Sequence, residues 1–588
     1  MKFKIVFGFL LLFIQSYGIN YQNLIIEYEK EDDNEIKITI PFLQYFENED
    51  LKIGFEKTET DKGTHYKVSL ITKQPIELDE VKMKVSIDTS LYSTYFCNGF
   101  QSWTTSKEFF PNEKIKKPAA LGKVIARYYG DYTYFKYKSR KGNIHSWTYT
   151  YLRSKQQDKI TLLASVAEFS GFTIFSYQLK KGQLQIIKEI NDLEIEANTS
   201  YTMLEWIEAT GNEYEVFNWY AEKNFENVSA EATRKGFSIK KSTALPTAGW
   251  TSWYHYYRDI ATDTILKNLN AFSEKQIPIG MFQIDDGFQK SIGEWTQTNN
   301  RFPEGMKAIA DSIHAKNIKA GLWLAPYIAE KKSILYETKK DWLLKNEKGK
   351  PIKAGYNPLW SGWYFPLDIY NKEVQQYLKN TFDTLLNHQG YDMVKLDFLF
   401  AACINPPESK SRGEMMFDGM LMLREWCGDK FILGCGVPLG TAFHLVDYCR
   451  ISSDIHMKWE QKLLKAMNMR ERLSVWNTIT SNIGRRHLNG NMFLNDPDVF
   501  VLREEKNKLK PNEKLLLFEI NNLFGSLVFT SDYIGNYNSE TLQLYKSKFP
   551  FQPEKQLKVN VVKKNIYEIK TSDKKFLFDL TKKGRSSD

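Results

Sequence analysis

Short apolar segments alternate with amphipathic ones between residues 241 and 534, and this alternation constrains the fold more than any other feature of the sequence. Apolar runs bounded by turn residues indicate buried strands, whereas apolar residues three and four positions apart indicate helices. Repeated strand–helix units form parallel sheets, and eight of them are typical of a (β/α)8 TIM barrel. The predicted strands are residues 247–250, 281–284, 319–324, 393–396, 431–434, 448–451, 491–494 and 526–530. The predicted helices are residues 262–275, 306–316, 373–388, 412–426, 460–480 and 512–524.

The segments on either side of this region have a different pattern. Residues 19–240 contain many short alternating segments, which predict an N-terminal antiparallel β-sandwich closed by a helix at 212–223. Residues 535–588 alternate again at 557–562, 566–570 and 575–580, which predicts a small C-terminal β-domain with a loose basic tail. The chain is therefore predicted to be a multidomain protein with a central barrel.

The N-terminus predicts export. Residues 1–18 combine a basic start, an apolar run at 5–14 and a small-residue end, which is typical of a cleaved signal peptide. The alternative is a membrane anchor, but a span needs roughly 20 apolar residues. We therefore expect a secreted or periplasmic protein with no membrane partner after cleavage.

Composition argues against nucleic-acid and metal partners. The net charge is +9 over 588 residues and no block of Lys and Arg concentrates it, so we expect no nucleic-acid partner. No Cys-x-x-Cys pair or His-rich spacing indicates a metal site, so we expect no metal or cofactor. An odd number of cysteines leaves at least one thiol free; the five are Cys97, Cys403, Cys427, Cys435 and Cys449.

Acidic residues follow several of the predicted barrel strands. They are Asp285 and Asp286 after the second strand, Asp397 after the fourth, Asp454 after the sixth, and Asp496 and Asp498 after the seventh. Barrel enzymes carry their active sites where the carboxyl ends of the strands meet. A single aspartate after a strand is more often a helix N-cap. Four acidic clusters at one rim repel one another and lose hydration, so together they indicate a functional site.

Glycoside hydrolysis requires two carboxylates with separate roles. Lys395 precedes Asp397 by one strand repeat, so both side chains point to one face, and we expect the lysine to keep Asp397 ionised as a nucleophile. Asp454 is the candidate general acid and must start protonated. Arg450 is expected to lie near it, and the sequence leaves open whether Asp397 or burial outweighs the arginine.

The adjacent Asp285 and Asp286 are suited to binding. Neighbouring carboxylates can accept hydrogen bonds from two adjacent sugar hydroxyls. The alternative is a Mg²⁺ or Ca²⁺ site, but metal loops usually place three or more oxygen ligands close together, and here Gly287 and Phe288 follow. We therefore expect these residues to bind sugar.

Aromatic residues make up 14% of the chain, and several lie beside the same strands. Trp250 and Trp253 are at the end of the first strand, and Trp323 is on the third. Each alone is more often core packing, but together at a barrel mouth they favour stacking on sugar rings. Trp103 lies in a polar turn, residues 98–103, that interrupts the alternation of the predicted sandwich; an ordinary turn is the alternative there.

The sequence resembles glycoside hydrolase family 36, the α-galactosidase or melibiase family, and is most similar to its shorter prokaryotic members. The resemblance covers residues 98 to about 503 and is strongest from 249 to 504. Seven motifs in barrel order are far more specific than one, and a turn in the sandwich precedes them. The turn is Asn98-Gly-Phe-Gln-Ser-Trp, and the motifs are Gly249-Trp-Thr-Ser-Trp-Tyr-His, Phe282-Gln-Ile-Asp-Asp-Gly, Gly321-Leu-Trp-Leu-Ala-Pro, Lys395-Leu-Asp-Phe-Leu-Phe-Ala, Leu433-Gly-Cys-Gly-Val-Pro, Arg450-Ile-Ser-Ser-Asp and Leu494-Asn-Asp-Pro-Asp.

The resemblance implies a role for each matching residue. Asp397 corresponds to the nucleophile and Asp454 to the general acid/base. Asp285 and Asp286 correspond to the pair that binds the 4- and 6-hydroxyls of galactose. The other substrate-binding positions are Lys395 near the sugar hydroxyls, Cys435 and Arg450 near the 2-hydroxyl, Trp253, Tyr254 and Trp323 in the pocket wall, and Trp103 at the rim.

The resemblance implies a retaining exo-α-galactosidase without a cofactor, acting on α-galactoside oligosaccharides or polysaccharides. Three alternatives stay open. Transfer of galactose to another sugar, as in raffinose synthases, would differ only in the loops on the leaving-group side. An α-N-acetylgalactosaminidase is disfavoured because Cys435 suits a free 2-hydroxyl. A non-catalytic carbohydrate-binding protein is disfavoured because both catalytic aspartates are present. The resemblance also leaves a homo-oligomer open.

Overall fold

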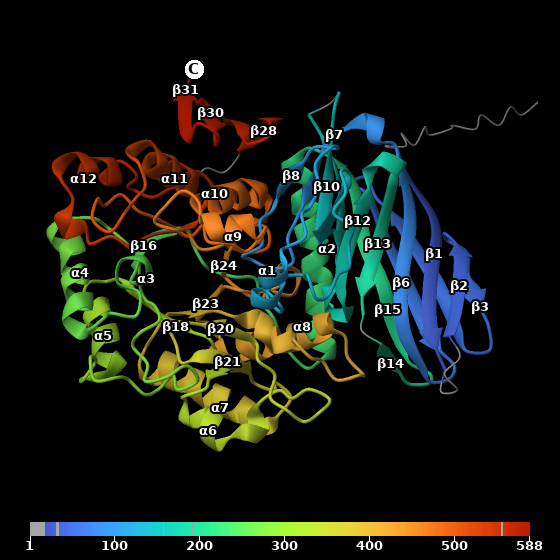
Figure 1. The fold of residues 1–588 in the computed structure, drawn as a ribbon, viewed down its shortest axis with the longest axis horizontal. Helices are drawn as coiled ribbons and strands as arrows, with labels where there is room; N and C mark the ends of the chain where they lie inside the picture. The colour runs from blue at the N-terminus through green and yellow to red at the C-terminus, as the bar shows by residue number, and fades with distance from the viewer. Residues whose placement is uncertain (1–17, 31–34, 157, 191, 554–556, 588) are drawn as a thin grey trace, which may run out of the picture.

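The computed structural model describes residues 18–30, 35–156, 158–190, 192–553 and 557–587. Apart from Gly18, the predicted signal peptide lies outside these residues, so export stays a prediction. Figure 1 shows layered strands on the right, a ring of short strands and helices on the left, and a small sheet at the top. Among the described residues, no helix is both long enough and apolar enough to cross a membrane.

Two antiparallel sheets form the N-terminal part, as the alternation predicts. One has the strand order β2-β1-β6-β13-β12-β9 with β14 paired to β6, and the other has the order β3-β4-β5-β15-β11-β10-β7-β8. The strands are β1 (Ile19–Glu29), β2 (Glu35–Pro41), β3 (Phe46–Glu47), β4 (Leu51–Glu59), β5 (Thr64–Thr72), β6 (Ile76–Ile87), β7 (Tyr92–Cys97), β8 (Lys107–Phe109), β9 (Asn143–Trp147), β10 (Tyr149–Ser154), β11 (Ile160–Ser165), β12 (Phe172–Gln178), β13 (Gln183–Glu189), β14 (Leu193–Ile195) and β15 (Ser200–Gly211).

The second sheet is buried on both faces. Neighbouring residues of β11 point to opposite faces, and they belong to different hydrophobic clusters. Leu163 packs in the cluster between the two sheets, whereas Leu162 packs in the cluster that continues into the barrel. Helix α2 (Glu213–Arg234) lies between sandwich and barrel and contacts β11 and β15 (Figure 1). This helix was predicted to end at residue 223 but continues to Arg234.

A ring of parallel strands forms the central part, which confirms the predicted barrel. Within the described residues its order is β25-β24-β23-β22-β18-β17-β16-β27-β26. The two ends of this order, β25 and β26, are one stretch of chain interrupted at Pro497 and Asp498, so the seventh strand closes the ring. The strands are β16 (Thr247–Thr251), β17 (Met281–Ile284), β18 (Lys319–Leu324), β22 (Met393–Leu396), β23 (Phe431–Gly434), β24 (Tyr448–Arg450), β25 (Leu494–Asp496), β26 (Val499–Phe500) and β27 (Leu527–Thr530).

The seventh strand and the helix before it differ from prediction. The strand was predicted at 491–494 but begins at Leu494, because residues 490–493 form a turn in which the Gly490 N–H donates to the Phe493 carbonyl. The predicted helix at 460–480 is two helices. Asn468 adopts a left-handed backbone conformation, with φ of 56°, that ends the first, and the Ser474 side chain caps the second.

The other barrel helices agree with prediction within a few residues, although the helix predicted at 373–388 continues past α7 as a single π-helical turn over residues 384–388. The α-helices after α2 are α3 (Trp253–Tyr256), α4 (Thr262–Glu274), α5 (Gly305–His314), α6 (Ile334–Thr338), α7 (Lys372–Asp383), α8 (Arg412–Cys427), α9 (Lys462–Ala466), α10 (Val475–Gly484) and α11 (Pro511–Phe524). A short helix, α1 (Ala120–Ile125), precedes them in the sandwich region. A small antiparallel sheet, formed by β19 (Ile328–Glu330), β20 (Gly355–Asn357) and β21 (Gly362–Pro366), is inserted after β18.

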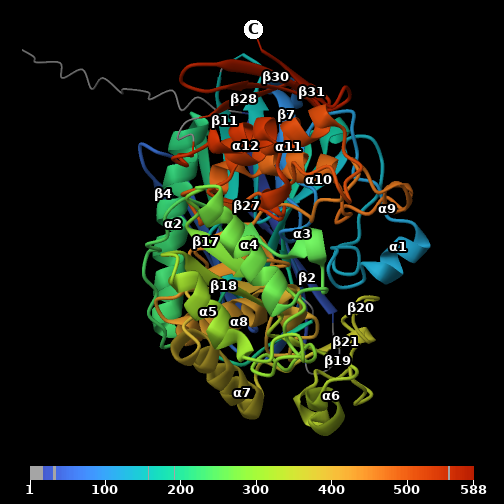
Figure 2. The same ribbon diagram turned by 90° about the vertical axis from the view of Figure 1, so that its left-hand side faces the viewer.

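The C-terminal segment begins with a helix, which the prediction of strands from residue 535 did not include. Helix α12 (Ser539–Lys546) comes first, and a four-stranded antiparallel sheet follows within the described residues. Figure 2 shows this sheet lying across α11 and α12. Its last strand contains part of the predicted loose tail and pairs with the strand before it. The strands are β28 (Lys558–Lys563), β29 (Ile566–Lys570), β30 (Lys575–Asp579) and β31 (Gly584–Ser587).

Candidate active site

Asp397 lies at the carboxyl end of β22, and its side chain is fixed from two sides. The Trp323 indole nitrogen donates to Oδ2 at 3.2 Å, and the Phe398 backbone N–H donates to Oδ1 at 2.9 Å. Burial is the main cause that raises the pKa of Asp397 above its ordinary value. The nearby charge of Asp454 raises this pKa further, whereas Lys395 acts to lower it. The two predicted catalytic carboxylates are therefore close enough to interact electrostatically.

Lys395 is paired with Asp285, and its charge is also the largest cause that lowers the pKa of Asp397, which agrees in direction with its predicted role. Its Nζ lies 2.8 Å from Asp285 Oδ2, which also accepts a hydrogen bond from Gln283 at 2.9 Å. Burial is the largest influence on the pKa of Lys395 and acts to lower it, but the charge of Asp285 together with those of Cys435 and Asp397 leaves the pKa raised. The lysine is thus a buried cation committed to Asp285, and its influence on Asp397 is weaker than that of burial.

Asp286 is held by residues that the sequence analysis missed. Gln289 donates to its Oδ1 at 2.6 Å and the Trp360 indole nitrogen donates to its Oδ2 at 2.8 Å. The Nε of Arg258 lies 3.3 Å from Oδ1. Burial raises the pKa of Asp286, and these partners oppose it. Trp360 comes from the turn between β20 and β21, a segment in which the sequence has no readable periodicity.

Arg450 connects three carboxylates at the end of β24. Its Nη1 lies 2.8 Å from Asp454, its Nε 3.0 Å from Asp496 and its Nη2 3.0 Å from Asp498. The spacing of Arg450 and Asp454 therefore does bring them together. The side chain of Asp454 is 33% exposed, whereas those of Asp496 and Asp498 are buried. Of the three, Asp454 is the carboxylate that water and a leaving group can reach.

Trp103 reaches the barrel mouth from the sandwich, so its turn is more than an ordinary turn. Its indole nitrogen donates to the Cys435 sulfur at 3.3 Å. Gly436 permits this approach, because a Cβ at that position would lie 2.8 Å from the Trp103 ring. The buried guanidinium of Arg485, just after α10, donates to Asn98 at 2.9 Å and fixes the turn on the barrel.

Aromatic rings border the carboxylates on one side. Phe398 lies between Trp103 and Trp360, with ring centroids 5.3 and 5.1 Å away, and Trp360 is 6.4 Å from Trp323. Phe398 has a φ of 56°, a strained backbone conformation of the kind that clusters at functional sites. By contrast, Trp250 is fully buried and is a core residue.

The remaining predicted wall residues lie on α3, after the first barrel strand. Tyr254 is buried and donates its hydroxyl to Asp498 at 2.6 Å. Trp253 is half-buried and its ring lies 5.2 Å from that of Tyr257. Asp498 joins the candidate site as well; the sequence analysis named it among the acidic residues that follow strands, in the Asn-Asp-Pro-Asp motif, but gave it no role.

The remaining candidate metal ligands are the cysteines and an acidic cluster on the sandwich. All five cysteines lie in the described part of the chain and are buried free thiols. Among the described residues, the group of three ligand-type side chains close enough to share an ion is Glu77, Asp79 and Asp192, on the sandwich.

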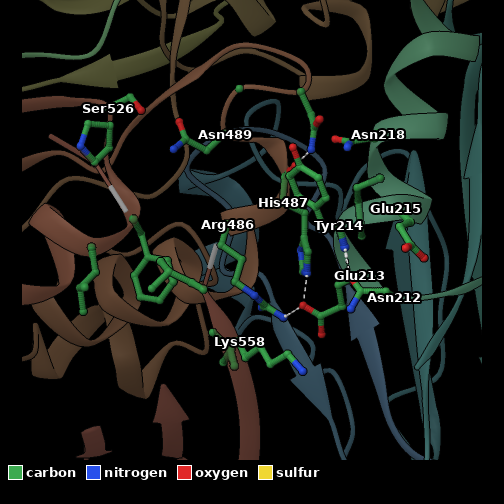
Figure 3. A pocket seen from close by; sticks show the side chains of 18 of the residues that line it. Asn212, Glu213, Tyr214, Glu215, Asn218, Arg486, His487, Asn489, Ser526 and Lys558 are labelled. Carbon is green, nitrogen blue, oxygen red and sulfur yellow. Dashed lines mark hydrogen bonds and ion pairs between the residues drawn. The ribbon is translucent and has the colours of Figure 1, made fainter. Parts of the chain in front are cut away.

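A cavity of about 610 Å³ lies at the opposite end of the barrel. It is bordered by residues at the amino ends of strands, such as Pro246, Leu494 and Ser526, and contains none of the predicted catalytic residues. Figure 3 shows Arg486 and His487 pointing toward Glu213 across this cavity. The Glu213 carboxylate accepts from Arg486 at 2.6 Å and lies 2.9 Å from the His487 ring nitrogen. Glu213 therefore pairs with both side chains.

Comparison with known proteins agrees with this arrangement. Residues 225–416 match the family Melibiase. Alpha-galactosidase 1 of Pediococcus pentosaceus is 28% identical over 130 residues, which are 21% of this chain and 17% of that protein. Alpha-xylosidase XylQ of Lactiplantibacillus pentosus is 31% identical over 145 residues, which are 24% of this chain and 18% of that protein. The matched stretch thus spans less than one fifth of each of these two relatives.

The fold is similar over almost the whole chain. TtGalA, an alpha-galactosidase from Thermus thermophilus solved with p-nitrophenyl α-D-galactopyranoside, has a TM-score of 0.69 at 23% identity, over 92% of this chain and 100% of that one. A variant of the family 36 alpha-galactosidase AgaA from Geobacillus stearothermophilus has a TM-score of 0.60 at 13% identity, over 95% and 79%. Together with the Melibiase match, the shared fold confirms the resemblance that the motifs predict.

Proposed function

We propose that this chain, a member of glycoside hydrolase family 36 by its melibiase region and its fold, is a retaining exo-α-galactosidase. The observation that carries the proposal is the pair Asp397 and Asp454 at the carboxyl ends of β22 and β24. Asp397 is enclosed and fixed by two hydrogen bonds, whereas Asp454 is partly open to solvent. Retaining glycosidases need one carboxylate held for attack and one that exchanges protons with water.

In the proposed reaction, Asp397 attacks the anomeric carbon while Asp454 protonates the leaving oxygen. The bond from the anomeric carbon to the leaving oxygen breaks as the bond to Asp397 forms, so the galactosyl group becomes covalently attached to the carboxylate. Asp454 then removes a proton from water, which attacks the anomeric carbon and releases Asp397. The hydrogen bonds from Trp323 and Phe398 orient Asp397 for both steps.

Substrate selection is proposed to rest on Asp285 and Asp286. Lys395 holds the first and Trp360 holds the second, so each carboxylate has a fixed direction. A site that hydrogen-bonds a hydroxyl rejects an analogue lacking it by about 10⁴-fold or more, because buried polar groups are then unpaired. A xyloside has no 6-hydroxyl, which favours a galactoside over the substrate named for the α-xylosidase relative.

The contact between Trp103 and Cys435 bears on a second candidate activity. The indole and the buried thiol lie 3.3 Å apart, at the wall where the family resemblance places the 2-hydroxyl. An N-acetyl group needs space there, so an α-N-acetylgalactosaminidase is disfavoured. Transfer to another sugar uses the same carboxylates and differs in the acceptor, and a non-catalytic binding role would leave the Asp397 and Asp454 arrangement without a purpose.

A panel of aryl α-glycosides tests the activity, with the anomeric form of the first product followed by NMR. We expect turnover of the α-galactoside, α-galactose as the first product, and at least about 10³-fold lower kcat/KM on α-glucoside, α-xyloside and α-N-acetylgalactosaminide. First-formed β-galactose would contradict the retaining mechanism. Equal activity on the glucoside or the xyloside would contradict the role of Asp285 and Asp286. Melibiose alone, compared with melibiose plus a second sugar, separates hydrolysis from transfer.

We also propose that the protein is exported and that the mature chain begins near Ile19. Residues 1–18 carry the signal-peptide pattern on which this rests. Expression of the full chain in a bacterium, followed by fractionation and N-terminal sequencing, tests it. Material that stays in the cytoplasm with Met1 intact would contradict export.

A further inference from the structure

We infer that Asp498 is a positioning residue for the general acid/base Asp454. It fixes the guanidinium and the backbone on which Asp454 depends. The inference rests on the proposed function, because it assigns Asp498 a task in the same reaction. Asp498 is fully buried, at the break in the seventh barrel strand.

The first connection runs through Arg450. Asp498 lies 3.0 Å from Nη2 of this arginine, and Asp454 lies 2.8 Å from Nη1. One planar guanidinium therefore pairs with both carboxylates, by a hydrogen bond to Asp454 and by an ion pair to Asp498, while its Nε donates to Asp496 at 3.0 Å. Because the fork is rigid, Asp498 and Asp496 together set the direction in which Nη1 presents to Asp454.

The second connection runs through the backbone. The N–H of Ile455, the residue after Asp454, donates to Asp498 Oδ2 at 2.7 Å. Tyr254 donates its hydroxyl to the same oxygen at 2.6 Å. Asp498 thus ties the chain next to the acid/base to a residue of the predicted pocket wall.

The backbone of Asp498 is itself held in a conformation that needs support. Its φ is 71°, which is uncommon for a residue other than glycine and costs about 1–3 kcal/mol. Its N–H donates to Asp496 at 2.8 Å, and Asn521 donates to its carbonyl at 3.0 Å. A strained residue held by several partners at the edge of a candidate site has the character of a functional residue.

The charges around Arg450 also support a positioning role for Asp498. Three carboxylates, Asp454, Asp496 and Asp498, face the single cation Arg450, with the Tyr254 hydroxyl as the other titratable neighbour. Burial raises the pKa of Asp498 to about 7, with Arg450 opposing and Asp454 adding to the rise. When Asp454 gives its proton to the leaving oxygen, its new negative charge must be stabilised by the guanidinium that Asp498 orients.

The test compares substrates whose leaving groups need the acid with one that does not. We would measure kcat/KM for wild type and Asp498→Asn on melibiose and on 2,4-dinitrophenyl α-galactoside. General acid catalysis contributes about 10²–10⁴-fold, and only to the poor leaving group, so Asp454→Ala sets the full scale. For Asp498→Asn we expect activity on melibiose to fall about 10- to 100-fold more than activity on the dinitrophenyl substrate.

Asp532→Asn is the matched control. Asp532 is also fully buried, pairs with Arg503 and accepts a tyrosine hydroxyl, that of Tyr537, at 2.7 Å. Since it contacts neither Arg450 nor Asp454 among the interactions described for it, its loss should change both substrates by the same factor.

Two outcomes overturn the inference. An equal loss on both substrates in Asp498→Asn, while Asp454→Ala shows the expected difference, would reduce Asp498 to a structural residue and leave the proposed function intact. If wild type turns over neither substrate, the proposed function itself fails. Should Asp498→Asn not fold, Tyr254→Phe removes the hydroxyl donor and keeps the carboxylate; it must show the same selective loss on melibiose, about 3- to 10-fold, or the inference is wrong.

Discussion

The two ends of the barrel both carry buried charge, but in different balance. At the carboxyl ends of the strands, Arg450 alone faces three carboxylates. At the amino ends, the Glu213 carboxylate faces Arg153, Arg486 and the His487 ring, and Arg153 also pairs with Glu108, so two arginines match two carboxylates. Burial raises the pKa of Asp498 at the first end. At the second end burial again acts to raise the pKa of Glu213, but Arg486 and Arg153 outweigh it and the pKa is lowered well below its ordinary value.

The difference separates charge used for chemistry from charge used for structure. Where anions exceed cations, some carboxylates hold protons near neutral pH and can exchange them, which acid/base catalysis requires. Where arginines match the carboxylates in number, Glu213 stays ionised and holds the elements together. The sandwich contributes Glu213 through the start of α2, and the barrel contributes Arg486 and His487 through the segment after α10.

Asp397→Ala should give the largest effect of any single change. Loss of the nucleophile should lower kcat on an aryl α-galactoside by at least about 10³-fold, and azide or formate should restore part of it by replacing the carboxylate. Because the removed group is a buried carboxylate with a raised pKa, we expect no loss of thermal stability. Near-wild-type turnover in this variant would show that Asp397 is not the nucleophile.

Glu213→Gln should show the reverse pattern. Removing the charge of Glu213 leaves Arg486 buried without its carboxylate partner, which costs about 3–5 kcal/mol in the free energy of unfolding. The folded variant should keep its kcat/KM, since the cavity lies at the far end of the barrel. Urea unfolding and kinetics on the same preparation measure both. A large loss of kcat/KM with stability unchanged would erase the proposed distinction between the two ends.

Trp360→Phe should give a moderate, purely functional effect. The indole donates to the buried carboxyl of Asp286, and leaving a buried polar group without its partner costs about 1–3 kcal/mol. We therefore expect kcat/KM on galactosides to fall about 10- to 100-fold. Trp363→Phe is the control, because Trp363 lies on the same hairpin but is 39% exposed. Equal losses in the two variants would mean that the hairpin matters only as a whole.

The smallest expected effect concerns how stability depends on pH, because Asp498 and Glu213 should contribute to this dependence with opposite signs. The folded pKa of Asp498 is about 7, above the ~3.9 of an unfolded aspartate, so its contribution to stability is present below about pH 4 and is lost as the pH rises through 7. Glu213 has a lowered pKa, so its contribution is present above the unfolded value of ~4.3 and is lost as the pH falls. Melting temperatures between pH 4 and 8 should show wild type losing stability relative to Asp498→Asn as the pH rises. Melting temperatures measured below about pH 5 should show wild type gaining stability over Glu213→Gln as the pH rises toward the unfolded pKa. Parallel curves for all three would contradict both assignments.

The barrel could be predicted because its signals are local. Strands such as Met281–Ile284 are short, apolar and bounded by turns, and the structure has them at the predicted residues. The errors fall where local signals compete. Residues 460–480 read as one helix, but Asn468 and the Ser474 cap divide it. The hairpin β20–β21 was not predicted because its pairing depends on contacts with β19, far along the chain.

Only those site residues that directly follow barrel strands could be predicted from the sequence. Asp285, Asp286, Asp397 and Asp454 follow strands, so the barrel alone places them at one mouth. Sequence spacing could not show which carboxylate pairs with Lys395, because Asp285 and Asp397 follow different strands of the same ring. Trp360 was missed because a loop delivers it, and Asp498 because its partners, Tyr254 and Ile455, come from other loops.

The contact between Arg485 and the Trp103 turn has a consequence for the order in which the protein is made. Arg485 and Asn98 are 387 positions apart, one near the end of the barrel and the other in the sandwich. Since domains generally fold as units, the N-terminal one first, we expect the sandwich to form before Arg485 is available to it. The barrel would then be completed on an existing surface, with Trp103 already in place to meet Cys435. A chain that stops before residue 485 would hold both proposed catalytic aspartates and still lack the arginine that fixes the Trp103 turn on the barrel.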